Sequence, residues 1–161
     1  MVTSFVKRTS EWVLLAYRLP REPSTPRIAL WRKLKRLGAG QLSDGLVALP
    51  LDGRTKEQME WSAEEVIEAG GEASIWTARP GTAAQERVLA RTMTDAIADE
   101  YRLVINAANT AQEDRANAHR TLARLRRELR RIRARDFFPP PERKDAESAV
   151  EALGTALEVA P

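Results

Sequence analysis

The chain has 161 residues, 43% apolar and 30% charged, a composition typical of one or two small folded domains and not of a disordered chain. It has no cysteine, which excludes disulfides and thiolate metal sites, and its single histidine, His119, cannot form a zinc site alone. No apolar run approaches the roughly 20 residues of a membrane helix. The N-terminus lacks the apolar core of a signal peptide, so we expect a cytoplasmic protein.

The first half of the chain begins with a strand and a helix. We expect a flexible N-terminal arm over 1–11, followed by an apolar run over 12–19 that is short enough to be a strand buried on both faces. Thr25 as N-cap and Pro26 at the first helical position predict the first helix, which Gly38 ends. The apolar face expected for this helix consists of Ile28, Trp31, Leu34 and Leu37.

A hairpin and a second helix are expected next. Two short strands are predicted around Asp44-Gly45, a dipeptide typical of tight hairpin turns. Thr55 and Gln58 predict a capping box at the start of the second helix. The apolar face expected for that helix consists of Met59, Ala63, Val66 and Ile67.

The fold class follows from the order of these elements. Gly70-Gly71 ends the second helix, and a fourth strand is predicted over 72–79. The order β-α-β-β-α-β predicts an α+β domain over 12–81, a ferredoxin-like antiparallel sheet with both helices on one face. Because no proline or glycine occurs between Thr82 and Arg135, we expect a helical extension after it. Within this extension, 82–161, helices are expected at about 82–108, 115–135 and 144–158.

Eight arginines fall within residues 120–135. Helical spacing places one apolar stripe on this segment, made of Leu122, Leu125, Leu129 and Ile132. Five of the arginines fall on the far side of the same helix: Arg120, Arg124, Arg127, Arg131 and Arg135. Residues 111–135 carry nine basic and three acidic side chains, whereas 136–161 carry two and six. The positive charge of the chain is thus concentrated in one amphipathic helix.

Three interpretations of this basic face stay open on the sequence. The planar guanidinium group of arginine can donate two parallel hydrogen bonds to the oxygens of one phosphate, which favours nucleic-acid contact. The face could instead pair with the acidic C-terminal segment, or be simply solvated. The first helix offers a second basic surface that could contact phosphates without reading bases. Its basic residues are Arg27, Arg32, Lys33, Lys35 and Arg36.

The aromatic residues are interpreted mainly as anchors. We expect most of Trp12, Trp31, Trp61 and Trp76 to be core or interface residues, with Trp61 lying off the apolar face of its helix. Phe137 and Phe138, beside three prolines, are expected to dock the last turn of the arginine helix. His119 is expected at the surface.

Three stretches carry a resemblance to a known family. WVLLAYRLPREPSTPRIALWRKLKRLGAGQLSDGLVALPL, the later GGEASIW and RIRARDFFPPP together resemble the N-terminal domain of the chromate-resistance regulator family ChrB, from about Trp12 to Pro141. The resemblance implies a cytoplasmic DNA-binding regulator that releases its promoter when chromate is present. ChrB proteins usually continue into a second domain of comparable size, and no set of arginines in this sequence singles out a chromate site.

The first eighty residues also resemble the ferredoxin-like domain of the phenylacetate repressor family, which is similar to small CRISPR integration nucleases. Those nucleases hold a metal with an aspartate at the end of the first strand. Here that position reads Tyr17-Arg18-Leu19, and the nearest carboxylate is Glu22, beyond a proline. We therefore expect no metal, no cofactor and no enzymatic activity.

The function expected from the sequence is DNA-binding regulation of a chromate-resistance operon, or the DNA-binding half of such a regulator. The expected partners are operator duplex DNA, a second copy of the chain in a homodimer, and chromate as an effector at an unlocated site. The residues expected to bind DNA are Arg120, Arg124, Arg127, Arg131, Arg27, Arg32, Lys33 and Arg36. The alternative is a protein–protein interaction module whose helical extension pairs with a partner or with itself.

Overall fold

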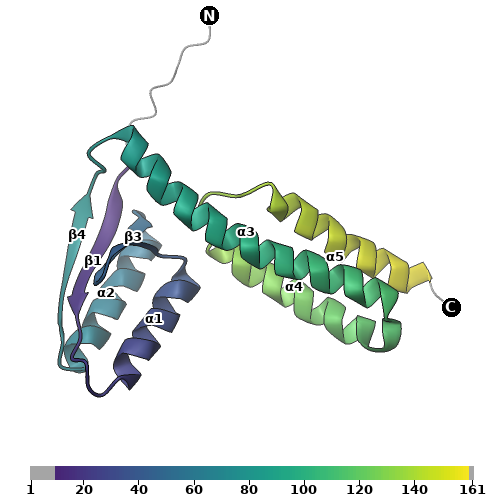
Figure 1. Cartoon of the computed structure of the whole chain (residues 1–161), viewed down its shortest axis with the longest axis horizontal. Helices are drawn as coiled ribbons and strands as arrows, with labels where there is room; N and C mark the ends of the chain where they lie inside the picture. The colour runs from purple at the N-terminus through teal and green to yellow at the C-terminus, as the bar shows by residue number, and fades with distance from the viewer. Residues whose placement is uncertain (1–9, 160–161) are drawn as a thin grey trace, which may run out of the picture. The chain divides into compact units, whose positions relative to one another are not determined.

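The computed structural model describes residues 10–159, which divide into two compact units with the boundary between Thr92 and Met93. The boundary falls inside the long helix α3 (Ala83–Glu113), about ten residues after the point where the sequence places the end of the first domain. Figure 1 shows α3 as one continuous helix. None of the helices between residues 10 and 159 combines the length and apolarity needed to cross a membrane.

The arm expected over 1–11 lies outside the described residues apart from its last two positions. The backbone N–H of Ser10 donates to the carboxylate of Glu86 at 3.1 and 3.2 Å. Glu11 forms an ion pair with Arg79, with 3.1 Å between the guanidinium nitrogen and the carboxylate oxygen. Both contacts lie within the first unit and hold the residues that lead into the first strand.

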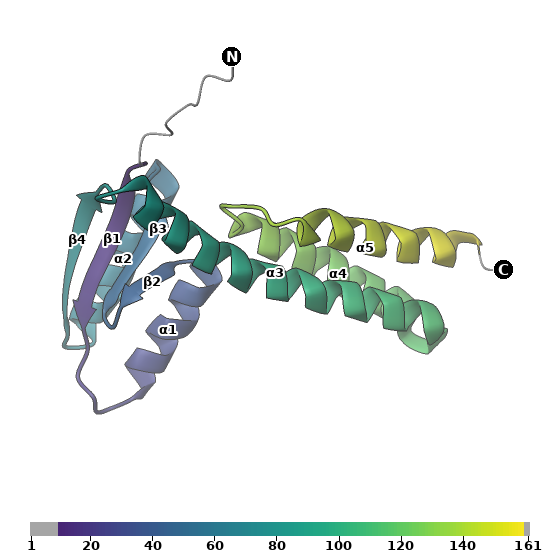
Figure 2. The same ribbon diagram turned by 45° about the horizontal axis from the view of Figure 1, so that its top comes forward.

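The first unit is a four-stranded antiparallel sheet with two helices that pack against each other (Figure 2). The strands stand in the order β2-β3-β1-β4. The expected β-α-β-β-α-β sequence of elements is confirmed. The elements are β1 (Trp12–Arg18), α1 (Thr25–Leu37), β2 (Gly40–Ser43), β3 (Leu46–Pro50), α2 (Gly53–Glu68) and β4 (Glu72–Ala78).

The two faces of β1 meet different neighbours. Strand alternation places Val13, Leu15 and Tyr17 on one face, and Val13 and Leu15 are fully buried there. Tyr17 lines a groove together with residues of α1. On the other face, Trp12 is buried and lines a small cavity with Leu89 of α3. The central strand is therefore buried on both faces, as its continuous apolar run predicts.

The buried face of α1 differs from the predicted one. Leu30 and Leu34 are buried, whereas Ile28 is 47% and Trp31 58% exposed. Leu30 lies four residues before Leu34 and Trp31 lies three residues before it. Both spacings place a residue on the same helix face as Leu34, so the sequence alone could not choose between Leu30 and Trp31. The helix begins at Thr25, but its N-cap is Ser24, whose side chain makes no capping hydrogen bond.

The capping box of α2 also lies elsewhere than predicted. The N-cap is Asp52, whose carboxylate accepts from the Thr55 N–H at 2.7 Å, while the Thr55 hydroxyl accepts from the Asp52 N–H at 2.9 Å. Thr55 thus occupies the third helical position rather than the cap. Met59, Ala63 and Val66 are buried as predicted.

Several apolar residues expected to be buried are at the surface. Ile67, predicted on the buried face of α2, is 57% exposed. Trp12 is a core residue, whereas Trp31 and Trp76 are each more than half exposed and are not core residues. Trp61, expected off the apolar face of its helix, is 53% exposed. A sheet with helices on one face cannot bury every large side chain of elements this short.

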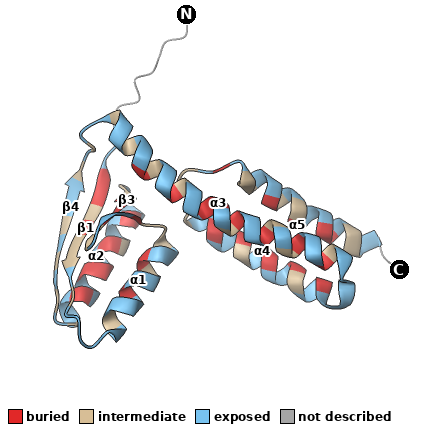
Figure 3. Ribbon diagram, viewed as in Figure 1, coloured by how far each residue is buried: buried red, intermediate tan, exposed pale blue. Residues whose placement is uncertain are grey.

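The second unit is a bundle formed by the later part of α3 with two further helices (Figure 3). The chain turns after Glu113 through a short 3₁₀ segment, where the Asp114 carboxylate accepts from the Ala116 N–H at 3.3 Å. The sequence predicts a break between helices at about 82–108 and 115–135, and the observed turn lies a few residues later because α3 continues to Glu113. The elements that follow are the 3₁₀ segment η1 (Arg115–Asn117), α4 (Ala118–Ala134) and α5 (Glu142–Val159).

The junction of α2 and β4 gives a stability prediction. A Cβ atom added at Gly71 would overlap the carbonyl oxygen of Arg18 and lie 2.9 Å from Cγ1 of Val66. Gly71→Ala should therefore lower the free energy of unfolding by about 1–3 kcal/mol. Gly53→Ala is the control, because a Cβ there meets nothing within 4 Å. Urea denaturation followed by circular dichroism measures both, and equal stability of the two variants would contradict the packing described.

Candidate nucleic-acid interface

The orientation of α4 is fixed by its apolar stripe. Leu122, Leu125 and Leu129 are at most 7% exposed, and Ile132 is fully buried, all in one core with residues of α3 and α5. Because these side chains face the bundle, the opposite side of α4 faces solvent. The sequence places five arginines on that side: Arg120, Arg124, Arg127, Arg131 and Arg135.

Three arginines of this face are exposed and form no ion pair within residues 10–159: Arg120, Arg124 and Arg127. Arg131 is also exposed, and its guanidinium lies 3.8 Å from the carboxylate of Glu128, one turn earlier. Arg135 differs, since its side chain is only 15% exposed and pairs with Glu100 of α3. The outer face therefore consists of four exposed arginines and ends before Arg135. We call these four residues, Arg120, Arg124, Arg127 and Arg131, the α4 basic face.

Helical spacing places Arg126 and Arg130 beside the apolar stripe, outside the set of residues expected to bind DNA. Arg130 is exposed and forms no ion pair in the described part of the chain. At about 100° per residue it lies some 60° around the helix from Arg127, so it widens the basic surface.

The acidic C-terminal helix pairs with other arginines. α5 packs into the bundle through Ala146, Val150 and Leu153, which are buried. Its Glu147 accepts from Nε of Arg133 at 3.0 Å and from Nε of Arg143 at 3.2 Å. These arginines lie outside the α4 basic face. Pairing with the acidic segment, one of the interpretations open on the sequence, therefore involves the flank of α4 and leaves the basic face available.

A buried polar contact holds the end of α4 to α3. The Tyr101 hydroxyl donates to the carboxylate of Asp136 at 2.7 Å, and the Asp136 side chain is fully buried. Burial, and then the hydrogen bond to Asp136, raises the pKa of Tyr101, so the phenol stays a donor. Close by, the hydroxyl of Thr94 donates to the carbonyl of Phe138 at 3.0 Å. The segment after α4 is thus attached to α3 within the second unit.

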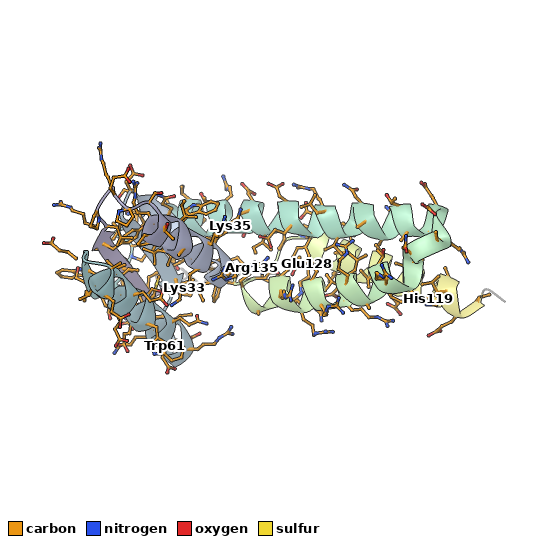
Figure 4. The ribbon with its side chains drawn as sticks, turned by 90° about the horizontal axis from the view of Figure 1, so that it is seen from below. Lys33, Lys35, Trp61, His119, Glu128 and Arg135 are labelled. Atoms are coloured by element: carbon orange, nitrogen blue, oxygen red, sulfur yellow. The ribbon has the colours of Figure 1, made fainter. Side chains whose placement is uncertain are left out.

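The basic residues of α1 separate into different environments. Lys33 points to α2 and forms an ion pair with Glu65 at 2.6 Å, whereas Lys35 lies over the Trp31 ring at 5.1 Å from its centroid. Figure 4 shows Lys33 and Lys35 on different sides of α1. Arg36 is exposed and has no ion pair among the described residues. Of the predicted DNA-binding residues on this helix, Lys33 is therefore the one already engaged by a carboxylate.

The two remaining arginines of α1 line an open groove of about 820 Å³ in the first unit. The groove lies between α1, the end of β1 and the β2–β3 turn, and we call it the α1 groove. Its lining residues with charged or aromatic side chains are Tyr17, Arg18, Arg27, Trp31, Arg32 and Asp44. The sequence did not predict this grouping, because three separate segments of the chain supply it.

His119 is exposed at the start of α4, as expected, at the opposite end of that helix from Arg135 (Figure 4). Between residues 10 and 159 no three side chains of the metal-ligating types gather closely enough to hold a metal ion. The protein instead presents two basic surfaces, the arginines of α1 in the first unit and the α4 basic face in the second.

Comparison with known proteins identifies the family. The sequence profile described as "Protein ChrB, N-terminal" matches residues 27–159, more than four fifths of the chain. The chain belongs to the ChrB N-terminal family. It is 28% identical over 153 residues to Protein ChrB of Cupriavidus metallidurans, an alignment that covers 92% of this chain and 47% of that protein. The chain thus spans about half the length of this ChrB relative. No solved structure matches it.

The contact between α4 and α5 predicts a pH dependence of stability. Hydrogen bonds from Arg133 hold the pKa of Glu147 below its ordinary value of 4.5. A lowered folded-state pKa stabilises the protein above pH 4.5, and this contribution is lost as the pH falls through the folded value. Glu147→Gln should lower the free energy of unfolding by about 0.5 kcal/mol at pH 7, the size typical of partly exposed pairs.

Chemical denaturation at pH 7 and pH 3.5 measures this effect. The difference between wild type and Glu147→Gln should shrink at the lower pH. Glu151→Gln is the matched control, since Glu151 is exposed on the same helix and has no ion pair in the described structure. A deficit of the Glu147 variant that is independent of pH would disprove the electrostatic origin of the effect.

Proposed function

We propose that the chain is the DNA-binding part of a regulator of a chromate-resistance operon and that it binds duplex DNA through the α4 basic face. Its membership of the ChrB N-terminal family supports the regulatory role. The observation that carries the proposal is the availability of this face: three arginines without ion pairs among the described residues, beside a fourth held only loosely by Glu128. Guanidinium groups bind phosphate oxygens through paired, charge-assisted hydrogen bonds.

The charges around α4 favour a polyanionic partner over simple solvation. A solvated helix face usually mixes signs, because residues four apart then pair. On α4 the single acidic residue is Glu128, while the carboxylates of α3 and α5 neighbour its flanks and pair with Arg135 and Arg133. The uncompensated charge lies on the outer face, where a phosphate backbone would neutralise it.

We propose a second DNA contact on α1, through Arg27, Arg32 and Arg36. These residues are exposed and form no ion pair within the described residues. Lys33, proposed on sequence grounds as a fourth, would first have to leave Glu65. The outer face of α2 in the same unit would be kept away from DNA by repulsion. Its exposed acidic residues are Glu57, Glu60, Glu64 and Glu68.

The alternative function, a protein–protein interaction module, has weaker support. If the helical extension paired with a partner through its apolar stripe, that stripe should be exposed. Leu122, Leu125 and Leu129 are instead buried within the chain's own bundle. Exposed Leu103, at 70%, and Trp61, at 53%, are separate surface residues on different units.

We also propose a fold class for the first unit and an effector for the regulator. The element order and the strand order β2-β3-β1-β4 support a ferredoxin-like arrangement of the first unit.

Chromate is proposed as the effector of the whole regulator, and we assign it no residues in this chain. Because the chain covers 47% of its ChrB relative, chromate binding could equally belong to a further domain of such a protein. No catalytic activity is proposed.

The salt dependence of DNA binding tests the α4 basic face. Arg124→Ala combined with Arg127→Ala should weaken binding to duplexes of any sequence. It should also flatten the log–log dependence of affinity on salt by roughly 2, because each phosphate contact contributes about 0.9. Stability should change by less than about 0.5 kcal/mol, since both side chains are exposed. Fluorescence anisotropy with labelled duplex at several salt concentrations measures the effect.

A charge-matched control separates the face from total charge. Arg87→Ala combined with Arg91→Ala removes the same two charges from exposed positions of α3 that have no ion pair in the described structure. This control should leave the salt slope unchanged. If both double variants lose affinity equally, net charge and not the α4 basic face governs binding, and the proposal fails.

We further propose that the chain acts as a homodimer. Two half-sites on an operator multiply a modest contact made by each copy. β4 is an edge strand of seven residues without proline, and it leaves one side of its backbone unpaired within the described sheet. Sedimentation at tens of micromolar should give a dimer. A strict monomer both with and without duplex DNA would refute the homodimer.

A further inference from the structure

The α1 groove combines arginines with aromatic side chains, and contact with phosphate alone would require only the arginines. The guanidinium groups of Arg18, Arg27 and Arg32 line it, and none of them forms an ion pair in the described part of the chain. Asp44 is the single carboxylate among the lining residues. The groove therefore has an excess of positive charge and favours an anion.

Aromatic side chains lie among these arginines. Trp31 lines the groove and is 58% exposed, although a tryptophan in a small domain is usually covered. Lys35 contacts the Trp31 ring but is not a groove residue, so a part of the indole stays available to a ligand in the groove. Tyr17 lies at the end of β1, where burial raises the pKa of its phenol and keeps it neutral. Neutral aromatic rings beside guanidinium groups suit a ligand with both a flat ring and a negative charge.

We propose that the α1 groove binds a nucleotide with an unpaired base, its base stacked on Trp31 and its phosphate held by Arg27 and Arg32. Gln41 and Asp44 supply hydrogen-bonding groups for the base edge, and Arg18 can reach a neighbouring phosphate. This inference deepens the part of the proposed function assigned to α1. It does not depend on the α4 basic face.

The dimensions of the groove favour this ligand over two simpler ones. A volume of about 820 Å³ falls within the range of about 300–1,000 Å³ usual for small-molecule sites and exceeds what a tetrahedral anion needs. A simple anion would also leave the exposed indole without a role. Duplex DNA presents its phosphates but keeps its base faces stacked, so it could contact the arginines and not Trp31. An unpaired base, either in a free nucleotide or in a strand, uses every group.

Substitution of Trp31 in the full chain tests the stacking. Trp31→Leu should weaken binding of a labelled single-stranded thymidine oligonucleotide by about tenfold, the usual scale for loss of one aromatic stacking partner. Trp31→Phe should retain most of the affinity, because a flat ring remains. Trp61→Leu and Trp76→Leu are matched controls at 53% and 59% exposure and should bind like wild type. Wild-type affinity of Trp31→Leu, or equal losses in all three leucine variants, would overturn the assignment.

Substitution of the arginines and competition identify the ligand chemistry. Arg27→Ala combined with Arg32→Ala should flatten the log–log salt dependence of single-strand binding by about 0.7, since the two arginines hold one phosphate and each phosphate contact contributes about 0.7. Displacement of the oligonucleotide by dTMP would show that a free nucleotide suffices. Failure of dTMP, with the Trp31 effect intact, would show that a strand is needed. Equal displacement by inorganic phosphate and dTMP would replace the nucleotide assignment with a simple anion site.

The same assay separates this inference from the proposed function. On the Arg124→Ala/Arg127→Ala background, Trp31→Leu should still weaken oligonucleotide binding by about tenfold, because the two sites lie on different units. If substitution of the α4 arginines left duplex binding unchanged, the proposed function of the α4 basic face would fail. Trp31→Leu should even then weaken binding of the single-stranded oligonucleotide. Loss of the Trp31 effect on this background would instead contradict an independent groove.

Discussion

The burial of one apolar stripe on α4 determines the charge distribution of the second unit. Each buried leucine contributes roughly 1.5–3 kcal/mol, whereas an exposed ion pair contributes at most about 1. Leu122, Leu125, Leu129 and Ile132 are all buried, so the rotation of α4 is set by these side chains and not by its arginines. The arginines take the directions that this packing leaves to them. Exposure of a basic face is thus a consequence of hydrophobic packing.

Ion pairs then divide the arginines of α4 into two groups. Two of them pair with carboxylates on neighbouring helices, Arg133 with Glu147 and Arg135 with Glu100. These pairs fasten the three helices together at their borders. Arg120, Arg124 and Arg127 on the outer face form no ion pair within residues 10–159, and Arg131 lies 3.8 Å from Glu128 of the same helix.

The α1 groove depends on a different constraint, the attachment of the β2–β3 turn to β1. The Tyr17 N–H donates to the Gly45 carbonyl at 2.8 Å. Gly45 has a φ of 75°, and a Cβ atom there would lie 2.5 Å from the Tyr17 carbonyl oxygen. Only glycine allows this close approach at a positive φ. The turn thereby brings Asp44 to the end of β1, opposite the arginines of α1.

The elements that could be predicted from the sequence are those whose signal is local and periodic. The β-α-β-β-α-β order, the buried face of α4 and its exposed arginines follow from spacing, and the ChrB resemblance agrees with the family match. The sequence could not decide between neighbouring residues that fit the helical spacing equally well. Leu30 is therefore buried where Trp31 was predicted to be. It also could not pair the carboxylates of α3 and α5 with particular arginines. Such contacts, like the grouping of Arg18, Trp31 and Asp44, depend on distances between segments far apart in the chain, and only the tertiary structure sets those distances.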